Sequence, residues 1–168
     1  MKSTPEAADK SQNVAALGPE RYLTFHLAGE EYGIDIMKVQ EIIGLVSITR
    51  VPTAPDYCRG VINLRGKVIP AFDLRAKLGM ETCDDTDRTC IIIVEVPGLN
   101  NQNHCGLVVD EVAEVLDISQ DELNPAPEYG SSVDEALIQA IGVVEGKVKI
   151  LLDIDRVLSG ESIQVSDA

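Results

Sequence analysis

Two aspartates, Asp73 and Asp153, are the first residues whose type and spacing could support a reaction. They stand 80 positions apart in similar surroundings, and two carboxylates from related halves of a chain form the catalytic pair of aspartic proteases. Those enzymes hold each aspartate in a tight Asp-Thr/Ser-Gly turn, whereas here the next residues are Leu-Arg and Ile-Asp. We therefore expect each carboxylate to cap a short helix by accepting backbone N–H groups. A hydrolase that pairs Asp73 with Asp153 is the alternative.

The other reactive side chains form no recognisable catalytic or metal-binding motif. His26 falls at a polar position of an alternating segment, and His104 lies in a polar turn. The cysteines lack CxxC spacing, so we predict reduced thiols and no zinc site at Cys58, Cys83, Cys90 and Cys105. The adjacent acidic pairs lack a calcium-loop pattern and are expected on the solvated surface, at 84–85, 110–111 and 121–122. The sequence favours a binding module with no enzyme activity, cofactor or metal.

Charge and composition restrict the class of partner. The 168 residues carry 14 Lys and Arg against 28 Asp and Glu, for a net charge of −14, and only 4% are aromatic. Nucleic-acid binding needs basic side chains and stacking rings, and anionic membrane surfaces also attract basic segments, so both are excluded as partners. No apolar run reaches the roughly 18–20 residues of a membrane span, and the start lacks an apolar signal sequence. We expect a cytoplasmic protein.

The charge is unevenly divided along the chain. Residues 21–80 hold eight basic and six acidic side chains, whereas residues 81–168 hold four basic and nineteen acidic ones. This asymmetry suits head-to-tail docking between a mildly basic part of one molecule and an acidic part of a related partner. Such an association is expected to weaken as the salt concentration rises.

Short strands are the elements that must position these residues. Alternating and continuous apolar runs predict strands at 22–27, 32–36, 46–51, 60–64, 67–72, 90–96, 105–109, 143–144 and 148–152. Helical turns are predicted at 73–78 and 155–158, and a helix at 133–140. Residues 1–20 are predicted to be a mobile tail, and residues 161–168 a frayed end.

An internal repeat relates the two halves of the chain. Residues 33–42 match residues 106–115, 73 positions on, and residues 54–57 match residues 126–129. Further matches lie 80 positions apart, between 66–68 and 146–148 and between 73–74 and 153–154. Their collinear order indicates a duplicated unit. We predict a mainly all-β fold of two five-stranded barrels that share a hydrophobic core, with subdomains at about 21–80 and 88–158.

One arginine interrupts an otherwise apolar strand and turn. Arg65 precedes Gly66 in a hairpin signal between the strands predicted at 60–64 and 67–72. A guanidinium at this position could anchor a partner by binding a carboxylate or helix carbonyls. The alternative is a local salt bridge to Glu41, and the spacing leaves both interpretations open.

Several motifs resemble the CheW family of bacterial chemotaxis coupling proteins. The resemblance covers about residues 20–160, in order, and its most specific motif is Gly-Val-Ile-Asn-Leu-Arg-Gly at 60–66. Other matching segments are 38–44, 49–55, 67–75, 106–112, 125–128 and 151–154. The resemblance implies SH3-like barrels around a shared core in one domain, residues 21–160, and no enzyme activity.

The resemblance also implies partners and contact residues. A CheW-like adaptor joins the cytoplasmic hairpin tip of a chemoreceptor to the regulatory domain of the histidine kinase CheA, by a helix-in-groove contact. Such an adaptor is recruited to membrane-associated receptor arrays without inserting into the membrane, and related modules serve chemosensory pathways other than motility. The implied contact residues of this chain are Val39, Glu41, Ile42, Gly60, Val61, Asn63, Leu64 and Arg65, with Val109 and Val112 added from the second half.

Overall fold

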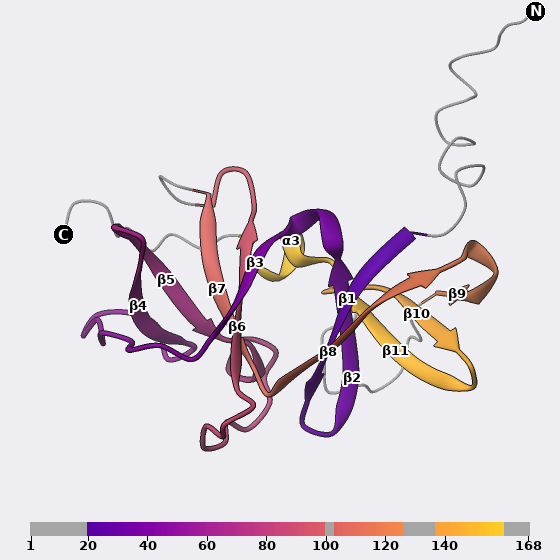
Figure 1. Ribbon diagram of the computed structural model, residues 1–168, viewed down its shortest axis with the longest axis horizontal. Coiled ribbons are helices and arrows are strands. Elements are labelled where there is room, and N and C mark those ends of the chain that lie inside the picture. The colour runs from indigo at the N-terminus through magenta and orange to yellow at the C-terminus, as the bar shows by residue number, and fades with distance from the viewer. Residues whose placement is uncertain (1–19, 100–102, 126–136, 160–168) are drawn as a thin grey trace, which may run out of the picture.

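The structure is a computed structural model that describes residues 20–99, 103–125 and 137–159. The predicted tail therefore lies outside the described residues except for Glu20, and so does the predicted frayed end. Figure 1 shows two groups of strands side by side, each forming one sheet. The mainly β class with two β subdomains is confirmed, while the SH3-like closure of each subdomain stays a prediction.

Eleven strands are assigned within the described residues, and they form two sheets. Sheet A has the order β8-β1-β2-β11-β10-β9, and sheet B has the order β3-β6-β7-β5-β4. The strands of sheet A are β1 (Glu20–Leu27), β2 (Glu30–Asp35), β8 (Glu111–Ile118), β9 (Leu123–Asn124), β10 (Ile138–Val144) and β11 (Lys147–Leu152). Those of sheet B are β3 (Val39–Gly44), β4 (Cys58–Leu64), β5 (Lys67–Asp73), β6 (Cys90–Glu95) and β7 (His104–Val109).

Four short helical segments complete the described structure. The 3-10 turns are η1 (Ile36–Lys38) and η2 (Gln120–Glu122), and the helices are α2 (Leu74–Lys77) and α3 (Ile154–Val157). Helix α2 follows β5 and α3 follows β11, at the ends of the two strands that the repeat makes equivalent. Both helices agree with the turns predicted at 73–78 and 155–158.

Three hairpins are closed by two-residue turns in which glycine takes the second position. Both turn residues have positive φ: 53° and 85° at Ala28 and Gly29, 53° and 88° at Arg65 and Gly66, and 54° and 79° at Glu145 and Gly146. Such turns match the right-handed twist of the flanking strands, and glycine adopts positive φ at little cost. Arg65 is therefore held at the tip of the β4–β5 hairpin.

The two sheets do not divide the chain into the halves that the repeat predicts. The hairpin β1–β2 joins sheet A, but the next three strands of the first half join sheet B, where they flank the hairpin β6–β7 from the second half. Strands β8, β10 and β11 return to sheet A. Under the repeat, the order β8-β1-β2-β11-β10 corresponds strand for strand to β3-β6-β7-β5-β4. The two repeats thus exchange their first hairpins, β1–β2 and β6–β7. The predicted subdomain bounds of 21–80 and 88–158 therefore do not match either sheet.

The exchange also redistributes charge. The strands of sheet A carry seven acidic and three basic side chains, and those of sheet B carry three acidic and two basic ones. The contrast between sheets is therefore smaller than the contrast between halves of the sequence. Sheet A is the more acidic of the two sheets.

Three hydrophobic clusters stabilise the arrangement. The largest contains residues of both sheets, including Phe25, Phe72, Ile92 and Leu152, each no more than 1% exposed. A smaller cluster belongs to sheet B and contains Ile62, Ile69, Ala71, Ile91, Ile93 and Val108. The third belongs to sheet A and is built around Tyr22, Ile118 and Leu151. The predicted shared core is confirmed, because the exchange leaves neither half a core of its own.

Local predictions differ from the structure in several segments. Residues 46–51 form no strand, and their only ladder contact among the described residues is a bridge between Thr49 and Val61. The predicted helix at 133–140 lies partly outside the described residues, but Ile138–Ala140 already belong to strand β10. Two strands of amphipathic sequence, β3 and β8, were not predicted, and both are sheet edges.

Candidate functional site

The tip of the β4–β5 hairpin carries the arginine that the sequence singled out. Arg65 Nη1 donates to Glu41 Oε2 at 3.2 Å, and its Nη2 donates to Glu41 Oε1. The hydrogen bond from Arg65 holds the pKa of the Glu41 carboxyl below its ordinary value. The salt-bridge alternative is thus confirmed, yet the Arg65 side chain is still 69% exposed. Glu41 orients a guanidinium that keeps most of its surface open to a partner.

The ion pair borders a hollow of about 360 Å³ over sheet B. Its lining combines an apolar floor with a charged rim: Gln40, Glu41, Leu64, Arg65, Lys67, Ile69, Ile93 and His104. Three of the predicted contact residues, Glu41, Leu64 and Arg65, are brought together here. Of the other five, Ile93 and His104 were missed because β6 and β7 come from the second half of the sequence, and Ile69 because its pattern is that of a core residue. Gln40 and Lys67 carried no signal beyond that of exposed polar strand positions.

Two further predicted contact residues support the hairpin itself. The Asn63 side chain is exposed, and its Oδ1 accepts a hydrogen bond from Gly66 N at 2.8 Å. This contact braces the turn that presents Arg65. Val61, half-buried in β4, exchanges backbone hydrogen bonds of 2.8 Å with Thr49 in both directions.

Gly60 has a structural role in the same hairpin. Its φ is +143°, and a Cβ atom at this position would lie 2.0 Å from the Thr49 carbonyl oxygen. Only glycine permits this approach of the 45–57 loop to β4. Gly60 is buried, so it acts by shaping the backbone and offers no side chain to a partner.

The remaining predicted residues lie on the edge strands β3 and β8 and at the end of β7. Val39 on β3 and Val112 on β8 are repeat counterparts, and both are half-buried against the shared core. Ile42 is 42% exposed on β3. Val109, by contrast, is 1% exposed and belongs to the shared core. Its side chain has no surface to offer, because the residue ends β7 beneath the connection to β8.

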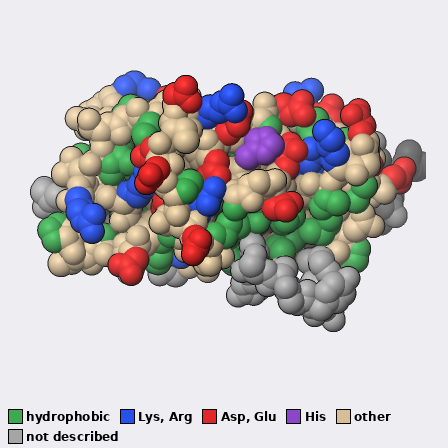
Figure 2. All heavy atoms as spheres, turned by 90° about the horizontal axis from the view of Figure 1, so that it is seen from below, with side chains coloured by type: hydrophobic (Ala, Val, Ile, Leu, Met, Phe, Trp, Pro, Cys, Tyr) green, Lys and Arg blue, Asp and Glu red, His purple; other side chains and the backbone are tan. Residues whose placement is uncertain are grey.

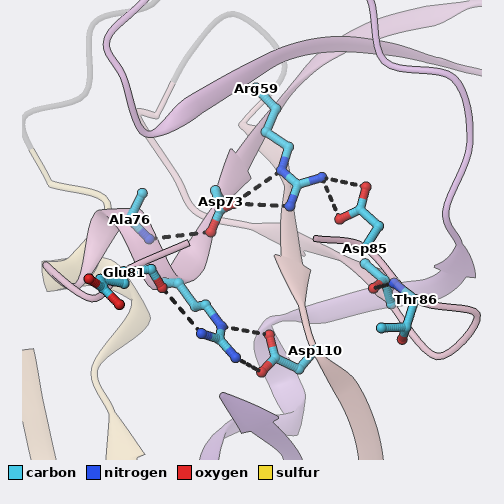
Figure 3. A network of polar contacts seen from close by, with 9 residues as sticks. Arg59, Asp73, Ala76, Glu81, Asp85, Thr86 and Asp110 are labelled. Atoms are coloured by element: carbon cyan, nitrogen blue, oxygen red, sulfur yellow. Dashed lines mark hydrogen bonds and ion pairs between the residues drawn. The ribbon is translucent and has the colours of Figure 1, made fainter. Parts of the chain in front are cut away.

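The two aspartates act as helix caps. Asp73 accepts a hydrogen bond from Ala76 N at 3.3 Å, and Asp153 accepts one from Arg156 N at 3.2 Å. Asp73 also accepts bonds from Arg59 Nε and Nη2 at 3.1 and 3.0 Å, as Figure 3 shows. Asp73 ends β5 in sheet B and Asp153 follows β11 in sheet A. The capping prediction is confirmed, and each carboxylate accepts hydrogen bonds from residues near it in the structure.

Two residues expected on the solvated surface are held by arginines instead. Asp85 pairs with Arg59 at 2.8 Å, and Asp110 pairs with Arg75 at 2.5 Å. Both pairs are drawn in Figure 3. The sequence could not reveal these contacts, because each joins segments that are at least 26 residues apart.

A second and larger hollow, of about 630 Å³, lies beside the 45–58 segment. Its walls mix exposed Leu45 and Val46 with the charged side chains of Asp56, Arg59 and Asp85. All four cysteines are free thiols. Within the described ranges, no three His, Cys, Asp or Glu side chains are grouped to hold a metal, and no helix is long and apolar enough to cross a membrane.

Apolar surface is not confined to sheet B. Val115, Val143 and Val148 on sheet A are between 39% and 54% exposed. In the view from below, hydrophobic side chains gather in the half of the face that holds sheet A, while charged ones are spread over both halves (Figure 2). Sheet A lacks the arginine turn, because Glu145 stands at the position equivalent to Arg65.

Comparisons with known proteins identify the family. The family model for the CheW-like domain matches residues 21–162. The chain belongs to the CheW-like family. It is 36% identical to the chemotaxis protein CheW of Klebsiella aerogenes, over 88% of this chain and 87% of that one. It is 34% identical to the chemotaxis protein CheW of Rhizobium meliloti, over 86% of this chain and 90% of that one.

A solved CheW structure shares the fold. The crystal structure of the scaffolding protein TtCheW from Thermoanaerobacter tengcongensis matches with a TM-score of 0.76 and 33% identity. The match covers 88% of this chain and 98% of that chain. Membership in the family and the fold with two β subdomains, both expected from the sequence motifs, are thereby confirmed.

Proposed function

We propose that this CheW-like protein is a non-catalytic adaptor that couples the cytoplasmic hairpin tip of a chemoreceptor to the regulatory domain of the kinase CheA. The observation that carries the proposal is the exposed Arg65, held by Glu41 at the charged rim of a hollow with an apolar floor. A helix laid across such a hollow buries its apolar face and offers carboxylates or C-terminal carbonyls to the guanidinium.

The same geometry argues against a hydrolase. A pair of catalytic carboxylates must share one site, but Asp73 and Asp153 cap different helices at the ends of strands in different sheets. The hollow that Asp73 lines does not include Asp153. We infer that the protein works by binding alone, at the cytoplasmic face of the membrane, where a receptor tip would recruit it.

The proposed receptor contact comprises Val39, Glu41, Ile42, Val61, Asn63, Leu64, Arg65 and Val112. The exposed Ile42 and the half-buried apolar side chains in this set would contact the partner helix, while Glu41 and Asn63 hold Arg65 and its turn in place. Gly60 shapes the hairpin, and Val109 is left out because it is buried.

Arg65→Ala tests the receptor contact. We expect the dissociation constant for a receptor cytoplasmic fragment to rise about tenfold or more, as for an arginine anchor at an interface. The melting temperature should change little, because an exposed ion pair contributes only about 0–1 kcal/mol. Calorimetric titration measures binding, and circular dichroism measures unfolding.

Glu145→Ala is the matched control for this test. It alters the equivalent turn of sheet A, which has the same backbone conformation, and should leave receptor binding unchanged. Equal affinity of Arg65→Ala and the native protein would remove Arg65 from the proposed contact. Failure of the native protein to bind any receptor fragment would refute the receptor role itself.

The kinase contact is expected to depend on salt. Sheet A is the more acidic sheet, and we propose that it faces a basic region of the regulatory domain of CheA. Complementary charges raise the association rate more than the final affinity. The rate measured by surface plasmon resonance should fall as salt rises from low to physiological concentration, and a constant rate would contradict this orientation.

A further inference from the structure

The chain passes between the two sheets twice within its described residues. The turn η1 leads from β2 in sheet A to β3 in sheet B, and Asp110 leads from β7 in sheet B to β8 in sheet A. Val39 follows the first crossover and Val112 follows the second. The two valines of the proposed contact therefore sit where the sheets meet, one on each sheet.

The second crossover is tied to both sheets through one carboxylate. Asp110 Oδ1 accepts from Arg75 Nε at 2.9 Å, and Asp110 Oδ2 accepts from Arg75 Nη2 at 2.5 Å and from Ala28 N at 2.9 Å. Arg75 lies on helix α2 at the end of sheet B, and Ala28 lies in the β1–β2 turn of sheet A. Figure 3 shows the two parallel bonds from Arg75.

These contacts are sheltered and charged. The Arg75 and Asp110 side chains are only 17% and 26% exposed. Burial opposes the charged form of Asp110, but the hydrogen bonds from Arg75 and Ala28 outweigh it and hold the carboxyl pKa below its ordinary value. The carboxylate is thus charged at neutral pH, and a planar two-bond pair with arginine fixes orientation as well as distance.

The first crossover is held by a weaker ion pair, in which the crossover supplies the cation and the helix supplies the carboxylate. Lys38 on η1 pairs with Asp155 on helix α3 at 3.1 Å, with side chains 30% and 50% exposed. Asp155 is the repeat counterpart of Arg75. A lysine gives one flexible contact where arginine gives two rigid ones. The two crossovers are therefore held unequally.

We propose that Asp110, held by Arg75 and Ala28, is a positioning residue that sets the angle between the sheets and thereby the spacing of Val39 and Val112 for the partner helix. The proposal rests on the proposed receptor contact. It predicts that a change at Arg75, which lies outside that contact, alters both the sheet angle and the affinity.

The test measures the sheet angle and the affinity separately. Residual dipolar couplings of the free protein report the relative orientation of the sheets, and calorimetric titration with a receptor cytoplasmic fragment reports affinity. Arg75→Met removes both hydrogen bonds to Asp110 while keeping the aliphatic stem. We expect a changed sheet orientation and about tenfold weaker binding, at a temperature where the variant is folded. Arg75→Lys restores the charge with a single flexible contact, so it should recover only part of the native sheet orientation and affinity.

Asp155→Asn is the matched control at the other crossover, and it should leave both measurements near the native values. An Arg75→Met variant with native sheet orientation would overturn the proposal, whether or not its binding is weaker. If Arg75→Met does not fold, Asp110→Asn is measured in its place, by the same criterion. Absence of binding by the native protein would refute the receptor role alone, because the couplings need no partner.

Discussion

Sheets A and B share one topology but differ at the site where sheet B forms its hollow. The floor of that hollow includes Ile69 and Ile93, with His104 at its edge. The repeat counterparts in sheet A are Lys149, Thr24 and Glu31. There Lys149 Nζ donates to Glu31 Oε1 at 2.5 Å, and the Lys149 side chain is only 5% exposed.

The comparison shows how duplicated positions acquire different roles. In sheet A, the ion pair ties β11 to β2 beside their short parallel pairing. Burial opposes the charge on Glu31, but the Lys149 contact prevails and lowers the carboxyl pKa below its ordinary value. In sheet B, Ile69 replaces the lysine and His104 replaces the glutamate, and both border an open hollow. One copy thus contributes to internal stability, and the other leaves the open hollow that we propose as the partner contact.

The largest expected effect comes from breaking the buried pair in sheet A. Lys149→Ile places the residue found in sheet B beside an unpaired, largely buried Glu31 carboxylate. Removing one partner of a buried pair costs about 3–5 kcal/mol of unfolding free energy. Urea denaturation followed by circular dichroism measures the loss.

The double variant Lys149→Ile with Glu31→His carries both residues of sheet B and separates the two possible causes. It should be clearly more stable than Lys149→Ile alone, because no unpaired carboxylate remains. Equal stability of the single and double variants would show that the loss comes from packing and not from the isolated charge.

A somewhat smaller loss of stability is expected at Gly60, which distinguishes the β4–β5 hairpin from the β10–β11 hairpin. Gly60→Ala should lower the unfolding free energy by about 3 kcal/mol, because a Cβ atom would clash with the Thr49 backbone at an unfavourable φ. Its repeat counterpart is Ala140 in β10. The matched change Ala140→Gly should cost only about 0.5–1 kcal/mol, and equal losses at both positions would contradict the special role of Gly60.

The smallest effect concerns the titration of Glu41. Since Arg65 depresses the pKa of Glu41, the ion pair persists at neutral pH and is lost only as the pH falls through that lowered value. Arg65→Ala should raise the Glu41 pKa toward the ordinary glutamate value of about 4.3. Carbon-13 NMR of the side-chain carboxyl follows the titration, and an unchanged pKa would mean that Arg65 and Glu41 do not interact in solution.

Local features of the fold were predictable from the sequence. Alternation identified β1, and the Arg65–Gly66 turn identified its hairpin, because glycine at the second turn position is a sequence signal for a tight turn. The aspartate caps followed from residue type and position. The repeat correctly indicated two related units around a shared core.

The pairing of strands was not predictable in the same way. Matching motifs in two halves show that the units are alike, but they do not show which hairpin pairs with which half. Asp110 and Glu111 were expected on the solvated surface, whereas Asp110 is bound by Arg75 from 35 residues away. The hollow was only partly predicted because strand pairing could not be predicted. Ile93 and His104 line it only because the β6–β7 hairpin joins sheet B.

The exchange of hairpins has a consequence for synthesis of the chain. Strand β1 ends at Leu27, but its outer partner β8 begins only at Glu111. At translation rates of about 5–20 residues per second, the β1–β2 hairpin waits on the order of ten seconds for its neighbours. During that time its edges and the apolar face of Leu23, Phe25 and Leu27 are without their final contacts. Folding of sheet A is therefore completed after most of the polypeptide has left the ribosome, and chaperones that shield short apolar hairpins would act on this chain early.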